Sequence, residues 1–159
     1  MDPLLHLLEH DALASREDLA AQLNLSKEEV ESRIAALEAE GVIIGYHTMI
    51  DDEKLGGNTV AAVIEVKITP EREGGFDRVA ERIARFDQVR ACHLMSGGYD
   101  LLAVVEGRNL REVATFVSEK LSPLEGVIAT STHFRLKAYK QNGVLLSRAT
   151  EAARLAVTP

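Results

Sequence analysis

The sequence of 159 residues predicts an α+β protein, with an N-terminal helix-turn-helix (winged-helix-like) domain followed by a C-terminal ferredoxin-like βαββαβ domain. Two observations lead to this fold class. Residues 1–50 contain three short segments in which apolar residues recur at helical spacing, each preceded by a capping signal. Residues 59–142 then follow the order strand, helix, strand, strand, helix, strand, which is typical of an antiparallel sheet covered by two helices.

The first helix is expected to begin after Asp2, because aspartate is a good N-cap and Pro3 suits the first helical position. Its leucine-rich pattern ends near His10. Ser15 and Ser26 each stand three residues before an acidic side chain, which is the form of a capping box. Two further helices are therefore expected from about residue 16 and from about residue 27.

The helix that begins near residue 16 is only two turns long, and a short turn joins it to the helix that begins near residue 27. This arrangement is helix-turn-helix geometry. In the third helix Val30, Ile34 and Leu37 recur on one side, so the opposite side is free to enter a groove of DNA. The residues expected to contact DNA lie at the start of this helix and on its free side: Ser26, Lys27, Glu28, Ser32 and Arg33.

Residues 51–58 end in Gly56-Gly57-Asn58 and are expected to form the linker to the second domain, residues 59–142. That domain should hold strands near residues 60–68, 90–95, 101–106 and 128–140 and helices near residues 76–83 and 110–121. Beyond it, a helical tail over residues 143–159 is expected from the spacing of Leu145, Ala149, Ala152 and Ala156.

Three side-chain patterns in the second domain can be tested directly. The helix capped by Asn109 is expected to bury Leu110, Val113, Ala114, Val117 and Leu121. The last strand should present Phe134, Leu136 and Ala138 on one side. Because two helices cover only one side of a sheet, the apolar residues of the other side favour a second copy and hence a homodimer: Ala61, Val63, Leu102 and Val104.

The charge of the chain is distributed unevenly. Residues 1–50 hold ten Asp and Glu against three Lys and Arg, which accounts for the whole net charge of −7. A surface that binds a duplex normally neutralises phosphates with Lys and Arg. The helical domain therefore combines a fold typical of nucleic-acid binding with an acidic surface.

The stretch EDLAAQLNLSKEEVESRIAALEAEGVIIGYHTMIDDEKLG, Glu17 to Gly56, resembles the Lrp/AsnC (feast/famine) family of prokaryotic transcriptional regulators, including the run from Arg33 to Tyr46. The resemblance covers residues from about 4 to 142. It implies a regulator that binds double-stranded DNA and a small-molecule effector, commonly an amino acid. It also implies dimers that join into tetramers or octamers, with the effector bound where dimers meet.

In this family a hairpin with a Gly, aromatic, Asp motif lies beside the effector pocket, and this implies an effector-binding role for Gly97, Gly98, Tyr99 and Asp100. Glycines let a ligand approach bare backbone amides, and an aspartate accepts hydrogen bonds from an ammonium group. The same residues also fit an ordinary turn. Thr130 and Thr132 offer hydroxyls for the same cavity, with solvated strand residues as the competing interpretation.

The sequence carries no phosphate-binding glycine loop, no HExxH helix, no GxSxG turn and no paired cysteines. No catalytic residue, cofactor or metal is therefore expected. Cys92 is alone, and the five histidines are interpreted one by one as surface or structural residues. No apolar run is as long as a membrane span, so no membrane partner and a cytoplasmic location are expected.

Two alternatives remain open at this level. In one, the acidic head has lost DNA binding and the chain acts as an effector-binding or hetero-assembly modulator. In the other it is an enzyme like the tetrapyrrole decarboxylases that resemble this family, although no residue marks their active site.

Overall fold

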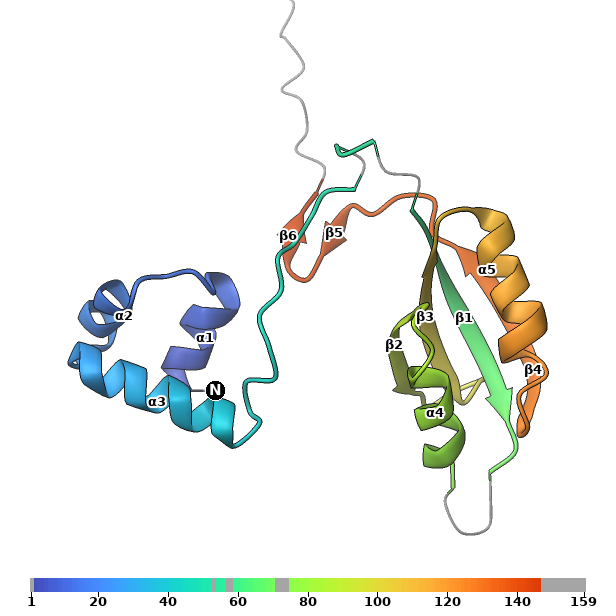
Figure 1. Ribbon diagram of the computed structural model, residues 1–159, viewed down its shortest axis with the longest axis horizontal. Helices are drawn as coiled ribbons and strands as arrows, with labels where there is room; N and C mark the ends of the chain where they lie inside the picture. Colours follow the sequence, from blue (N-terminus) through green and yellow to red (C-terminus); the bar gives the residue numbers. More distant parts are fainter. Residues whose placement is uncertain (1, 53, 57–58, 71–74, 147–159) are drawn as a thin grey trace, which may run out of the picture. The chain divides into compact units, whose positions relative to one another are not determined.

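The computed structural model describes residues 2–52, 54–56, 59–70 and 75–146. The chain divides into two compact units, Met1–Ile50 and Asp51–Pro159, which we call the helical head and the sheet domain (Figure 1). No helix in the described part of the chain is long and apolar enough to cross a membrane.

The helical head contains three helices, α1 Pro3–His10, α2 Arg16–Leu23 and α3 Lys27–Ala39. They begin at the residues that the capping signals predict. Their buried apolar side chains form one small core: Leu4, Leu8, Leu19, Ala20, Val30 and Ile34. The described residues after α3 form a turn and an extended segment without a strand, so the part of the head that the structure describes has no wing.

The two serine caps differ in detail. Ser26 and Glu29 form a complete capping box, because the hydroxyl accepts from the Glu29 amide while the Glu29 carboxylate accepts from the Ser26 amide. Ser15 also caps its helix, but its hydroxyl donates to the Asp18 carboxylate 2.7 Å away. Asn24 ends α2 with φ 52° and ψ 44°, a left-handed conformation that asparagine tolerates better than most residues. This residue makes the tight turn into α3.

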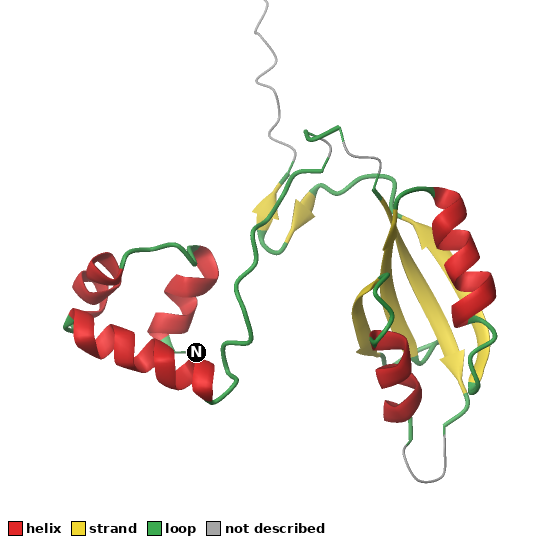
Figure 2. Cartoon of the chain, viewed as in Figure 1, coloured by secondary structure: helices red, strands yellow, loops and turns green. Residues whose placement is uncertain are grey.

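The sheet domain has the predicted element order and the ferredoxin-like strand order β2-β3-β1-β4, with every neighbouring pair antiparallel (Figures 1 and 2). Its elements are β1 Val60–Ile68, α4 Asp77–Ala84, β2 Val89–Leu94, β3 Leu101–Gly107, α5 Leu110–Phe116, the π-helical turn η1 Val117–Leu121, and β4 Val127–Phe134. The predicted order of a helix-turn-helix domain and a ferredoxin-like domain is confirmed, but the described part of the head lacks the wing that the prediction included.

Both helices of the sheet domain pack on one face of the sheet. The alternate residues of β1 are buried there, as their period of two predicts: Ala62, Ile64, Val66 and Ile68. The helices contribute Val79 and Ile83 from α4 and Val113 and Phe116 from α5 to the same core. On the other face, Val63, Leu102 and Val104 remain half-exposed, whereas Ala61 is already buried within the chain.

The predicted inner face of α5 is partly wrong. Leu110 is 57% exposed and Ala114 is also exposed, while Phe116 is buried in their place. Within α5 the buried residues are Val113 and Phe116, three residues apart, so the inner face is turned away from Leu110 and Ala114. The π-helical turn η1 follows and, because such a turn contains an extra residue, Leu121 is buried five residues after Phe116.

The predictions for the C-terminal residues also need correction. β4 ends at Phe134 and Leu136 is 96% exposed, so the last strand does not continue to residue 140. β5 Lys140–Gln141 and β6 Val144–Leu145 form a small hairpin where a helix was expected to begin. Asn142 and Gly143 turn this hairpin with φ of 45° and 83°, a sequence that strongly favours two-residue turns. The remaining tail, residues 147–159, lies outside the described residues.

Candidate functional site

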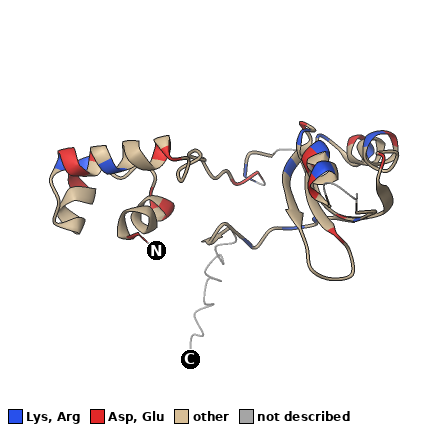
Figure 3. Ribbon diagram, turned by 90° about the horizontal axis from the view of Figure 1, so that it is seen from below, with Lys and Arg blue, Asp and Glu red and all other residues tan. Residues whose placement is uncertain are grey.

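The N-terminal half of α3 presents the five residues predicted to contact DNA. Lys27, Glu28, Ser32 and Arg33 are exposed on the surface of the head. The hydroxyl of Ser26 is committed to its cap, 3.1 Å from the Glu29 amide. Along the ribbon of these helices, acidic and basic positions follow one another at short intervals (Figure 3). The structure therefore brings these residues onto one accessible stretch of helix.

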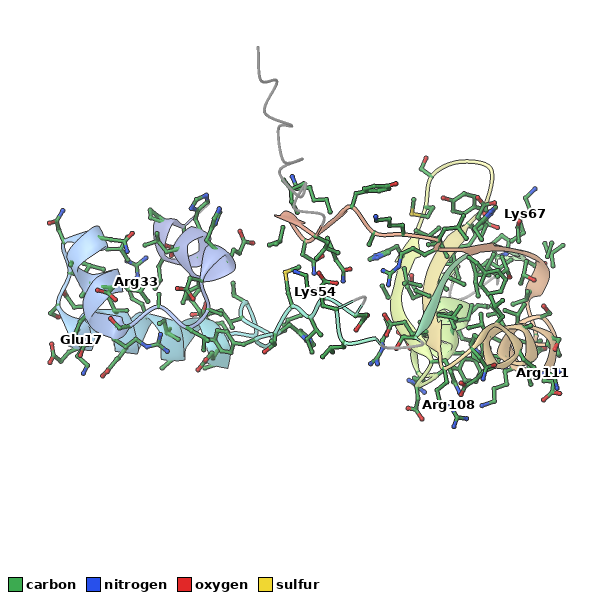
Figure 4. The ribbon with its side chains drawn as sticks, turned by 90° about the horizontal axis from the view of Figure 1, so that it is seen from above. Glu17, Arg33, Lys54, Lys67, Arg108 and Arg111 are labelled. Carbon is green, nitrogen blue, oxygen red and sulfur yellow. The ribbon has the colours of Figure 1, made fainter. Side chains whose placement is uncertain are left out.

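The two cations of this stretch are held by carboxylates from the other helices of the head. Lys27 Nζ lies 2.7 Å from a carboxylate oxygen of Glu17 on α2. A terminal nitrogen of Arg33 lies 3.0 Å and 2.8 Å from the two carboxylate oxygens of Asp2, the N-cap of α1 (Figure 4 labels Glu17 and Arg33). Sequence reasoning assigned Asp2 only as a cap and missed this second role.

These contacts perturb the titration of their partners. Hydrogen bonds from the Leu4 amide and from Arg33 lower the pKa of Asp2. The Lys27 ammonium lowers the pKa of Glu17, and Glu17 in turn raises the pKa of Lys27. The charges of Lys27 and Arg33 are thus partly neutralised within the head.

The C-terminal end of α3 is tied to the start of the following segment. Gly41, with φ 72°, donates to the Glu38 carbonyl, and Val42 donates to the Leu37 carbonyl, which is a Schellman motif. The hydroxyl of Tyr46 donates to the Glu38 carboxylate at 2.8 Å, and this bond raises the pKa of Tyr46. Gly41 and Tyr46, both within the run from Arg33 to Tyr46, therefore have a local structural function.

The loop between β2 and β3 contains four of the residues implied in effector binding. A Cβ atom on Gly97 or Gly98 would meet no other atom within 4 Å, so the backbone is open on that side. Tyr99 is half-buried. Asp100 is partly structural, because its Oδ2 accepts from the Ile68 amide at 2.9 Å and its own amide donates to the Val66 carbonyl at 3.1 Å.

The two threonines lie on β4, on the other side of β1 from Asp100. Thr130 pairs with Val66, the residue to which the Asp100 amide donates, while Thr132 pairs with Ile64 further along the strand. Both are half-buried, and the hydroxyl of Thr130 lies 3.1 Å from that of Ser122. Asp100 and Thr130 therefore share one end of the sheet, whereas Thr132 lies toward its middle.

Comparison with known families identifies both units of the chain. A family model for the AsnC-type helix-turn-helix domain matches residues 3–38, and one for the Lrp/AsnC ligand binding domain matches residues 61–145. The chain belongs to the Lrp/AsnC family. It is an Lrp/AsnC-type helix-turn-helix transcriptional regulator with a ligand-binding domain, as the sequence resemblance predicts. The alternative of a degenerate head finds no support, since the head itself matches the family.

Individual members of the Lrp/AsnC family agree with this assignment. The chain is 45% identical to the uncharacterized HTH-type transcriptional regulator YugG of Bacillus subtilis strain 168, over 98% of this chain and 95% of the relative. It is 33% identical to a proline dehydrogenase transcriptional activator of Rhodobacter capsulatus, over 85% and 87%. The solved complex of the transcriptional regulator NMB0573 with L-Met, from Neisseria meningitidis, has the same fold, with a TM-score of 0.71, 22% identity, and coverage of 87% and 88%.

Proposed function

We propose that this Lrp/AsnC protein binds operator DNA through the exposed N-terminal half of α3. When an amino acid binds the sheet domain, the protein releases the DNA or changes its arrangement on it. The observation that carries the DNA-binding part is the geometry of α3. Its start is fixed by a complete capping box, and its exposed residues include the two cations Lys27 and Arg33. A helix presented in this way fits the major groove, with its first residues near the bases.

The ion pairs of the head define how this binding would work. Lys27 and Arg33 must exchange Glu17 and Asp2 for phosphate oxygens, or keep them and contact DNA with their remaining N–H groups. Either route makes a single head a weak binder. Affinity then depends on two or more heads that bind together, which fits an assembled regulator.

The exposed outer face of the sheet supports a homodimer as the assembling unit. Val63, Leu102 and Val104 form a half-exposed apolar group in the middle of that face. A second copy that covers it would remove this apolar surface from water. Dimers of this kind would hold two heads for two half-sites of DNA.

An amino acid is the proposed effector class. The relative from Neisseria meningitidis was solved with L-Met, and the relative from Rhodobacter capsulatus is named a proline dehydrogenase transcriptional activator. In this chain, the open backbone at Gly97 and Gly98 offers amides for a carboxylate, and Asp100 has a second carboxylate oxygen for an ammonium group. Thr130 is the threonine better placed to join them.

The DNA-binding proposal is tested by titrating pooled genomic fragments with the wild-type chain and with Lys27→Ala and Arg33→Ala. Both substitutions should weaken binding across sequences by removing contacts to phosphate. Lys67→Ala, an exposed lysine of the sheet domain, is the matched control. Equal DNA affinity of the wild type and the three variants would show that Lys27 and Arg33 of α3 do not contact DNA.

The effector proposal is tested by thermal unfolding of the full chain with each common L-amino acid. Gly98→Val should abolish the stabilisation by the active amino acid, because the new side chain fills the open backbone without meeting the core. Ser96→Ala in the same loop should keep it. A response that survives in Gly98→Val would place the effector elsewhere.

A further inference from the structure

Helix α1 carries two histidines one turn apart on its exposed side. His6 and His10 are both exposed, and their ring centroids lie 4.6 Å apart with an angle of 32° between the ring planes. Histidines at positions i and i+4 of a helix project from the same side, which is the spacing that supplies two ligands in helical zinc sites. The sequence HLLEH, residues 6–10, has this spacing with an acidic residue between them.

The protonation of His10 also suits a metal ligand. Its Nδ1 lies 3.0 Å from the backbone carbonyl oxygen of His6. A carbonyl oxygen only accepts, so Nδ1 carries the proton and donates it, and the lone pair of the neutral ring is on Nε2. In metal sites the same Nδ1–H to carbonyl bond commonly orients the ring and leaves Nε2 for the metal.

The surroundings of His6 leave room for an ion and its water. A surface hollow beside α1 is lined by Pro3, His6, Leu7, Gln22 and Leu23, and His10 is exposed one turn further along the helix. The head as a whole has ten acidic and three basic residues, so its field attracts cations. Arg33 and Lys27, two of its three basic residues, are already paired with Asp2 and Glu17.

We infer that His6 and His10 form a binding site for a divalent transition-metal ion on α1, with Zn²⁺, Ni²⁺ or Cu²⁺ as the class of ion that imidazole ligands select. The described residues contain no group of three or more His, Cys, Asp and Glu placed around one ion, so two imidazoles and water complete the site. A metal bound by both histidines would stabilise the last turn of α1. The N-cap of this helix, Asp2, forms the ion pair with Arg33.

The test is a calorimetric titration of the full chain, without an affinity tag, with NiCl₂ and separately with ZnCl₂. The wild type should bind one ion per chain, and His6→Gln and His10→Gln should each weaken that binding by roughly tenfold or more, because a single imidazole cannot chelate. His47→Gln, another exposed histidine of the head, is the matched control and should bind as the wild type does. MgCl₂ should give no heat of binding, since Mg²⁺ prefers oxygen ligands.

Circular dichroism of the two variants establishes that α1 still forms. Metal binding that is unchanged in both folded variants, or a wild type that binds no tighter than His6→Gln, would overturn the inference.

Discussion

At the residue scale, the contact between Arg33 and Asp2 joins side chains 31 positions apart in the sequence. It gives one carboxylate two functions, because Asp2 caps α1 through the Leu4 amide and also holds a cation of α3. Neither function depends on burial, since Arg33 and Asp2 are both partly exposed. Asp2 thereby belongs to the surface that we propose for DNA binding.

We predict that Asp2→Asn makes the stability of the head less dependent on pH. The folded pKa of Asp2 is below its ordinary value of 3.8, so its charge stabilises the fold above that pH and the effect is lost as pH falls through the lower folded value. Asparagine keeps the cap but not the charge. Thermal unfolding from about pH 2 to pH 6 should show a gap between wild type and variant that closes on acidification. A gap that stays constant would contradict the prediction.

A second residue-scale prediction concerns Gly126, in the turn before β4. A Cβ there would lie 2.9 Å from Val79 Cγ2, and the residue has φ +93°. We expect Gly126→Ala to lower the free energy of unfolding by about 1–3 kcal/mol, through overpacking and backbone strain. Gly98→Ala, where the new methyl group meets nothing, should be much milder in the same chemical denaturation experiment. Equal losses for the two variants would show that packing on Val79 is unimportant.

The sequence alone could not predict the ion pairs of the head. Asp2 and Arg33 meet only because α1 packs against α3, which no local pattern encodes. His6 and His10 were instead visible as an i, i+4 pair, but each histidine was considered singly. Their spacing was the signal that could have identified them.

At the element scale, periodicity and capping predict most of the fold. The period of two in β1 identifies its buried residues, and the caps at Asp2, Ser15, Ser26 and Asn109 identify four helix starts. Prediction fails where a local geometry departs from the regular period. The buried face of α5 runs through Val113 and Phe116 and the π turn η1 changes the spacing after it, while the Asn142–Gly143 turn forms a hairpin where a helix was expected to begin.

We predict that the inner face of the sheet carries most of the stability of its domain. Ile64→Ala removes a fully buried side chain at the centre of the core and should cost about 2–5 kcal/mol in chemical denaturation. Ile128→Ala makes the same chemical change on β4, where the side chain is 66% exposed, and should stay within about 0.5 kcal/mol of wild type. Comparable losses of unfolding free energy in the two variants would mean that the Ile128 side chain is more buried in the protein in solution than it is in a single chain.

At the scale of the whole molecule, the head and the sheet domain each have a core of their own. A regulator needs its heads to be held at a defined spacing, and nothing in a single chain supplies a second head. The half-exposed group of Val63, Leu102 and Val104 is the surface on which that spacing depends in our proposal.

We predict that Val104→Glu dissociates the proposed homodimer and leaves the fold intact, because the side chain points away from the core formed with α4 and α5. Light scattering coupled to size exclusion should report the mass of one chain for this variant and at least two for the wild type. Leu136→Glu, at a 96% exposed position outside the sheet, should behave as the wild type does. A wild type with the mass of a single chain would refute the dimer.

The internal pairing of Lys27 and Arg33 also sets how the regulator should respond to electrolytes. A free cation that meets a phosphate displaces condensed counterions, and each such event steepens the dependence of affinity on ionic strength. A cation that already carries its own carboxylate displaces fewer, and the carboxylate it leaves behind is repelled by the duplex. The affinity of this protein for DNA should therefore vary with ionic strength less steeply than the number of its phosphate contacts suggests.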